Sequence, residues 1–157
     1  MTSRIFIHGL DSSNQGTKSI YFRERFPDMM IPTFTGDLQE RMKKLDTVLS
    51  GKSEIRLVGS SLGGLMASLF AMDNPTRVKK MVLLAPALNL MEFAPQTIRR
   101  LDIPVWIYHG KDDDVIPLRA VERIAEDTFQ DLSFHAVEDD HFLHKTFKNI
   151  AWDNLLA

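Results

Sequence analysis

Two serines in a glycine-rich stretch are the first candidates for chemistry. Residues 57–67 read L-V-G-S-S-L-G-G-L-M-A, and Gly59 to Gly63 within this stretch fit the pattern G-x-S-x-G. In that pattern a serine lies on a sharp turn between a strand and a helix, and the glycines permit close backbone contacts. Only Ser61 occupies the central position. Ser61 is therefore the predicted nucleophile, and Ser60 is interpreted as a small spacer in a crowded turn.

A nucleophilic serine needs two partners. Its hydroxyl is weakly nucleophilic near neutral pH, so a histidine must take the proton and a carboxylate must fix the tautomer of that histidine. His141 and Asp113 follow Ser61 in the chain and are predicted to fill these roles. Asp112 and Asp114 flank Asp113 and remain rivals for the acid.

Stabilisation of an oxyanion calls for backbone donors close to the nucleophile. The predicted helix that starts at Leu62 offers a free N–H and the positive end of its dipole at that point. The N–H of Leu10, after the first predicted strand, is the second candidate. Leu10 and Leu62 are thus the predicted oxyanion hole.

The remaining polar groups are given structural roles. His8 and His109 are interpreted as hydrogen-bonding residues ahead of proton transfer, and His135 and His144 as surface or packing residues. The run from Asp112 to Asp114 lacks the glycine, alternating oxygens and terminal glutamate of an EF-hand. We therefore expect no metal and no cofactor.

The elements that must position these groups alternate between strand and helix. Strands are predicted where β-rich or continuous apolar runs occur, at residues 4–8, 29–34, 55–58, 78–85, 105–109 and 132–137. Helices are predicted by capping signals and apolar spacings of three or four, at residues 18–26, 38–49, 62–72, 118–124 and 143–156. The alternation predicts an α/β three-layer sandwich whose doubly wound, mostly parallel sheet has about six strands.

The candidate groups all follow predicted strands. In open parallel sheets ligands bind outside the carboxyl ends of the strands. Leu10, Ser61, Asp113 and His141 each come shortly after a different strand. We therefore expect them to meet at one edge of the sheet.

Four motifs together resemble the α/β-hydrolase superfamily. They are I-F-I-H-G-L as the oxyanion turn, L-V-G-S-S-L-G-G as the nucleophile elbow, Y-H-G-K-D-D-D-V-I-P as the acid loop and E-D-D-H-F as the histidine loop. The order Ser, Asp, His is also that of this superfamily. The family pattern H-G-x-x-D-x-x-V-P implies Asp113 as the acid, with isoleucine here before Pro117. More narrowly, H-G-L-D-S-S followed by Lys18 is similar to small, capless YqiA-type serine esterases, which have H-G-F-N-S-S and a lysine at the same spacing.

Composition limits the kinds of partner and environment that we expect for this protein. The chain has 157 residues, 44% of them hydrophobic and 25% charged, which predicts one globular domain over residues 1–157. A net charge of −2 and no long basic tract argue against nucleic acid. Without cysteine there is no disulfide or thiol nucleophile, and without a secretory start or a long apolar run we expect a cytoplasmic protein with no membrane span. The oligomeric state stays open.

The substrate is the least determined feature. Only 17 residues, 87–103, connect two central strands, which suits one crossover helix and leaves no room for a lid domain. One interpretation is an open cleft lined by apolar side chains, namely Leu88, Leu90, Met91 and Phe93 together with Leu10 and Phe142. Ordinary packing of the crossover is the other. The first favours short acyl esters or thioesters as small-molecule substrates.

The predicted activity is two-step acyl transfer through an acyl-enzyme, that is, a carboxylesterase-like serine hydrolase. A thioesterase, lactonase, amidase or acyltransferase with the same triad is the alternative among enzymes. A binding module whose triad is vestigial is the alternative outside enzymes.

Overall fold

A parallel five-stranded sheet forms the centre of the molecule. The computed structural model describes residues 2–94 and 98–157. The strands lie in the order β1-β2-β3-β4-β5, and every neighbouring pair is parallel. Their bounds are Ser3–Ile7 (β1), Ile55–Ser60 (β2), Val78–Leu84 (β3), Leu101–Gly110 (β4) and Phe129–Val137 (β5). The predicted α/β fold is thus confirmed, with five strands in place of about six.

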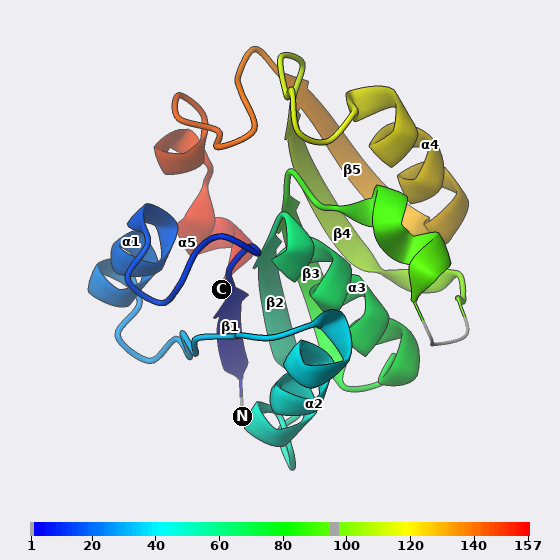
Figure 1. Ribbon diagram of the computed structural model, residues 1–157. Helices are drawn as coiled ribbons and strands as arrows, with labels where there is room; N and C mark the ends of the chain where they lie inside the picture. The colour runs from blue at the N-terminus through cyan, green and yellow to red at the C-terminus, as the bar shows by residue number, and fades with distance from the viewer. Residues whose placement is uncertain (1, 95–97) are drawn as a thin grey trace.

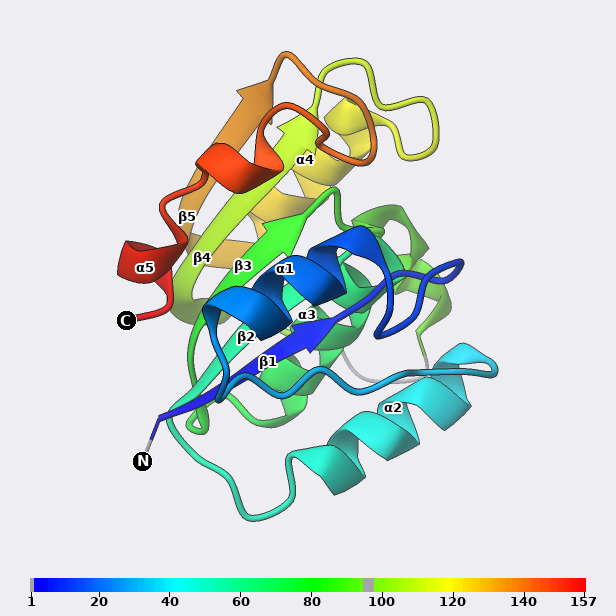
Figure 2. The same cartoon turned by 90° about the vertical axis from the view of Figure 1, so that its left-hand side faces the viewer.

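Helices cover both faces of the sheet. The α-helices are α1 (Thr17–Arg25), α2 (Leu38–Val48), α3 (Leu62–Asp73), α4 (Leu118–Thr128) and α5 (Trp152–Leu155), and the 3-10 helices are η1 (Leu88–Phe93) and η2 (Phe147–Asn149). Figure 1 shows α1 and α5 on one face and α2, α3 and α4 on the other. Figure 2, turned by 90°, shows α1 and α2 passing on opposite sides of β1. The result is three layers.

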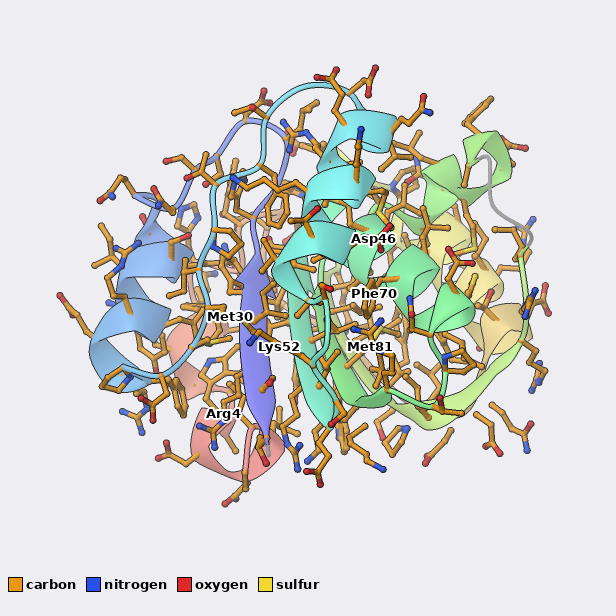
Figure 3. The ribbon with its side chains drawn as sticks, turned by 90° about the horizontal axis from the view of Figure 1, so that it is seen from below. Arg4, Met30, Asp46, Lys52, Phe70 and Met81 are labelled. Atoms are coloured by element: carbon orange, nitrogen blue, oxygen red, sulfur yellow. The ribbon has the colours of Figure 1, made fainter. Side chains whose placement is uncertain are left out.

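Alternation along the strands fills two separate cores. Successive side chains of a strand point to opposite faces. Ile5 of β1 and Met81 of β3 pack with Phe70 of α3, whereas Phe6 of β1 packs with Phe22 of α1 on the other face. Figure 3, seen from below, labels Phe70 and Met81 in the layer of α2 and α3. Burial on both faces explains why these strands read as continuous apolar runs.

The strand expected over residues 29–34 reduces to a single bridge, a correction of the sequence prediction. Only Met30 pairs with the sheet, in parallel with Ile5 of β1. Pro32 interrupts the run and has no N–H to donate to a ladder. Met30 still lies beside β1, as Figure 3 shows. β2 pairs with β1 on the side opposite to Met30. The chain thus lies first on one side of β1 and then on the other, and parallel sheets form ligand crevices at such a reversal.

Two predicted helices are also corrected. Residues 143–156 form turns, η2 and the four-residue α5 instead of one helix. Leu143 has a positive φ of 53°, and Ile150 is extended (φ −68°, ψ 139°), so a continuous helix is broken at both residues. The crossover over residues 87–103 contains the 3-10 helix η1 in place of an α-helix, and part of it lies outside the described residues.

Candidate active site

Ser61 lies on a strained turn between β2 and α3. Its φ of 55° and ψ of −117° are in a region that non-glycine residues rarely adopt. A Cβ at Gly59 would come within 2.3 Å of the Gly63 oxygen, and one at Gly63 within 2.0 Å of the Ile7 oxygen. Both glycines are therefore required by close backbone contacts. Ala85, at the end of β3, also has a positive φ of 44°.

Backbone hydrogen bonds hold this turn. The Ser61 amide donates to the Leu84 oxygen (2.9 Å), and the Ser61 oxygen accepts the amides of Gly64 (3.0 Å) and Ala87 (2.9 Å). The turn is thereby tied to β3 and to the segment that follows it. Since no side chain of Ser61 takes part in these three bonds, the hydroxyl can be altered without undoing them.

Asp113 and His141 form a hydrogen-bonded pair. The His141 Nδ1–H donates to Asp113 Oδ2 at 2.7 Å, and both side chains are almost fully buried, at 9% and 0% exposed. Asp113 Oδ1 accepts the backbone amides of Val115 (2.9 Å) and Ile116 (2.8 Å). In these three hydrogen bonds the oxygens of the Asp113 carboxyl act as acceptors. Asp112 and Asp114, the rivals, are exposed side chains of the same loop.

The loop that carries His141 is shaped by a carboxylate that the sequence analysis did not single out. Asp139 is 3% exposed, and its oxygens accept the amides of Asp140 (2.8 Å), Lys145 (2.9 Å) and Thr146 (2.7 Å). Lys18 of α1 donates to the Phe142 oxygen at 2.8 Å, directly after His141. The acidic letters before His141 were the available signal, but nothing in them distinguishes a loop organiser from a solvated turn.

The turn after β1 presents the other predicted oxyanion donor. His8 Nδ1–H donates to the Gly9 oxygen at 2.7 Å, and His8 Nε2 accepts the Phe34 amide at 2.8 Å. In a trans peptide the Leu10 N–H points opposite to the Gly9 oxygen, so these bonds set its direction. Leu62 is the first residue of α3, where helix amides have no intrahelical acceptor.

One cavity connects these groups. It has a volume of about 650 Å³ and includes Ser61, His141, Leu10 and Leu62 in its lining. Its walls come from all five strand ends: the turns after β1 and β2, the segment after β3, and the loops after β4 and β5. The predicted convergence on one edge is therefore what the structure displays.

Some of the predicted acyl-site residues line the cavity and others do not. Phe142 and Leu90 line the cavity and are 58% and 40% exposed. Leu88 and Met91 are instead buried in the core beside α3 and α4, and Phe93 is exposed outside the cavity lining. The reason is the 3-10 helix η1, which turns two of its apolar side chains inward. This corrects the prediction for Leu88, Met91 and Phe93.

Several cavity residues were missed. Asn89, Val115 and Ile116 belong to the lining, and so does Lys18. Val115 and Ile116 follow Asp113 by two and three residues. Their amides hold the Asp113 carboxyl and their side chains line the cavity, so one short loop provides both. Among residues 2–94 and 98–157 no group of three metal-ligating side chains is found. Nor does that part of the chain contain a helix that could cross a membrane.

We expect stability to decline as the pH falls below about 6.5. Burial lowers the pKa of His8 and the pKa of His109, so the folded protein holds both imidazoles neutral while the unfolded chain takes up protons. The unfolded state then binds more protons, and the free energy of unfolding rises with pH until the unfolded histidines are neutral. Urea unfolding at about pH 5.5, 6.5 and 7.5 measures this.

The comparison variant is His135→Gln, which alters an exposed histidine stacked on Tyr108 and should keep the same pH dependence. His109→Gln should reduce the pH dependence to the part that His8 contributes. An unfolding midpoint that does not change over this range would contradict the assignment.

Known proteins agree with this architecture. The chain matches the family model of the α/β hydrolase fold over residues 6–100, which is more than half of its length. No protein of curated function matches it by sequence. The chain belongs to the α/β-hydrolase family.

Solved structures resemble it across nearly its full length. A YdeN-like protein from Pectobacterium atrosepticum is 19% identical with a TM-score of 0.76, covering 100% of this chain and 94% of that one. Est1E from Butyrivibrio proteoclasticus with bound ferulic acid is 15% identical with a TM-score of 0.80, covering 99% and 86%. A monoacylglycerol lipase from Paleococcus ferrophilus is 15% identical with a TM-score of 0.73, covering 97% and 91%. At these identities the likeness shows the fold, which this chain shares with esterases and lipases.

Proposed function

We propose that this protein is a serine hydrolase of carboxylic esters, with Ser61 as nucleophile, His141 as base and Asp113 as acid. The observation that carries the proposal is the buried 2.7 Å hydrogen bond between His141 and Asp113 beside a cavity that also contains the strained Ser61. A carboxylate that fixes the Nδ1–H tautomer leaves Nε2 of His141 unprotonated, as a general base must be.

The reaction proceeds in two halves. Ser61 Oγ attacks the carbonyl carbon, its proton passes to His141 Nε2, and the oxyanion receives the N–H groups of Leu10 and Leu62. His141 then gives that proton to the departing alkoxide, and the acyl group stays on Ser61. Water, activated by the same histidine, releases the acid and restores the serine.

The substrate is proposed to be a small ester with an apolar acyl group. Leu10, Val115 and Phe142 line the cavity and remain 58%, 60% and 58% exposed, so they offer apolar surface at its mouth. Ferulic acid in the similar Est1E structure is a carboxylic acid of the kind that ester hydrolysis releases. A series of aryl esters with lengthening acyl chains, alongside matched thioester, lactone and amide substrates, separates an esterase from the other hydrolases with the same triad.

A fluorophosphonate probe tests the nucleophile directly. The probe is expected to label the native protein on Ser61, as located by peptide mass analysis, because only an activated serine attacks phosphorus rapidly. Urea-denatured protein should not react. A native protein that remains unlabelled and yet binds small carbonyl compounds would instead be a binding module.

A further inference from the structure

A second histidine lies behind the proposed acid. His109, near the end of β4, is 0% exposed and does not belong to the cavity lining. Its Nε2 is 2.9 Å from the Ile116 oxygen and 3.2 Å from Asp113 Oδ2. It therefore lies beside the acid but outside the cavity lining, and the two-step reaction makes no use of it.

The tautomer of His109 follows from its partners. A carbonyl oxygen only accepts, so the short contact with Ile116 requires the proton on Nε2. The other nitrogen, Nδ1, is buried without a partner. A second proton there would be a buried, unsatisfied donor, and burial correspondingly lowers the pKa of His109. His109 is a neutral imidazole whose one N–H donates to the Ile116 carbonyl and lies close to the Asp113 carboxylate.

The hydrogen bonds of Asp113 show how His109 can influence the acid. Oδ1 accepts two backbone amides, from Val115 and Ile116, and Oδ2 accepts His141. His109 adds no further hydrogen bond to the carboxylate: its N–H donates to the Ile116 oxygen, and its Nε2 lies 3.2 Å from Oδ2. The Ile116 oxygen belongs to the same turn whose amides hold Oδ1, so His109 fixes the loop that presents the carboxylate.

We propose that His109 is a positioning residue that holds the turn carrying Asp113, and through that turn the carboxylate, in the orientation needed by His141. The inference rests on the proposed function only for its kinetic effect, because the geometry it describes is present without substrate. His109 acts through Asp113 and is not itself in contact with the reacting atoms.

Three substitutions separate positioning from packing. His109→Gln retains an amide donor that reaches the Nε2 position, His109→Asn keeps a polar amide that is too short to reach it, and His109→Met fills the space without a donor. We expect His109→Met and His109→Asn to lower kcat by about 10- to 100-fold, because the buried Ile116 oxygen in the turn that holds the acid is left without its donor, with KM unchanged. His109→Gln should stay within about threefold of the parent.

A spectroscopic measurement needs no substrate. The Nδ1–H proton of His141, held by a carboxylate, gives a far-downfield NMR resonance, which should persist in His109→Gln and vanish or shift in His109→Met and His109→Asn. His135→Gln, in an exposed histidine of β5, is the matched control and should leave both readouts unchanged.

The possible results distinguish failure of this inference from failure of the proposed function. Folded Met and Asn variants that keep both kcat and the downfield resonance would overturn the inference, as would a Gln variant as impaired as these two. If the parent protein hydrolyses no ester but the resonance still responds to the Met and Asn changes and survives in Gln, the positioning role stands and the proposed function falls.

Discussion

Ser61→Ala is expected to lower kcat for ester hydrolysis by a factor on the order of 10⁴ to 10⁶. The substitution removes the oxygen that attacks the carbonyl carbon and carries the acyl group in the proposed mechanism. Turnover by direct attack of water would still benefit from the oxyanion donors, so a small residual rate is expected. Steady-state kinetics with an aryl ester measures the loss.

The fold of this variant should persist. The three backbone hydrogen bonds that hold the turn involve only the amide and carbonyl of Ser61, which alanine retains. Ser53→Ala, which changes an exposed serine just before β2, at the opposite end of that strand from Ser61, is the control and should keep full activity. A folded Ser61→Ala protein with undiminished esterase activity would refute Ser61 as the nucleophile.

Asp113→Asn is expected to lower kcat by about 10⁴-fold while preserving the loop. An asparagine that keeps its oxygen on the amides of Val115 and Ile116 must turn its NH₂ group toward His141. That group donates, so His141 can meet it only with an unprotonated Nδ1, which moves the imidazole proton to Nε2. In this tautomer His141 cannot take the proton of Ser61. The rate, the circular dichroism spectrum and the melting temperature should be compared with those of the parent.

Asp112→Asn and Asp114→Asn complete that experiment. Both residues are exposed neighbours of Asp113 in the same loop, and the same chemical change there should leave kcat within about twofold. If either neighbour caused the larger loss, the acid would have been assigned to the wrong carboxylate.

The fold could be predicted from sequence where one strong local signal acted alone. The apolar runs of β3 and β4 and the Asp37 capping box of α2 depend on short-range chemistry. The failures came where the backbone interrupts an apolar pattern. Pro32 limits the strand after α1 to one bridge, and the positive φ of Leu143 and the extended Ile150 break the expected C-terminal helix.

The site shows the same division. Ser61, Asp113 and His141 could be chosen because a parallel sheet brings loops after successive strands to one edge, whatever their separation in the chain. The residues of the cavity wall could not be predicted, because the apolar pattern of residues 88–93 does not reveal which side chains a 3-10 helix turns inward. His109 was recognised as a hydrogen-bonding histidine, but its partner depends on a turn that closes Ile116 back over β4.

The left-handed backbone of Ser61 and Ala85 has a consequence for engineering. Both residues sit where a strand ends at the cavity, and each adopts a conformation that glycine would accept at lower cost. Local preference and global fold therefore disagree at this edge, and a search for stabilising substitutions would favour glycine at position 61. Such a search would remove the proposed nucleophile first, so any thermostable variant of this protein has to be selected with position 61 held constant.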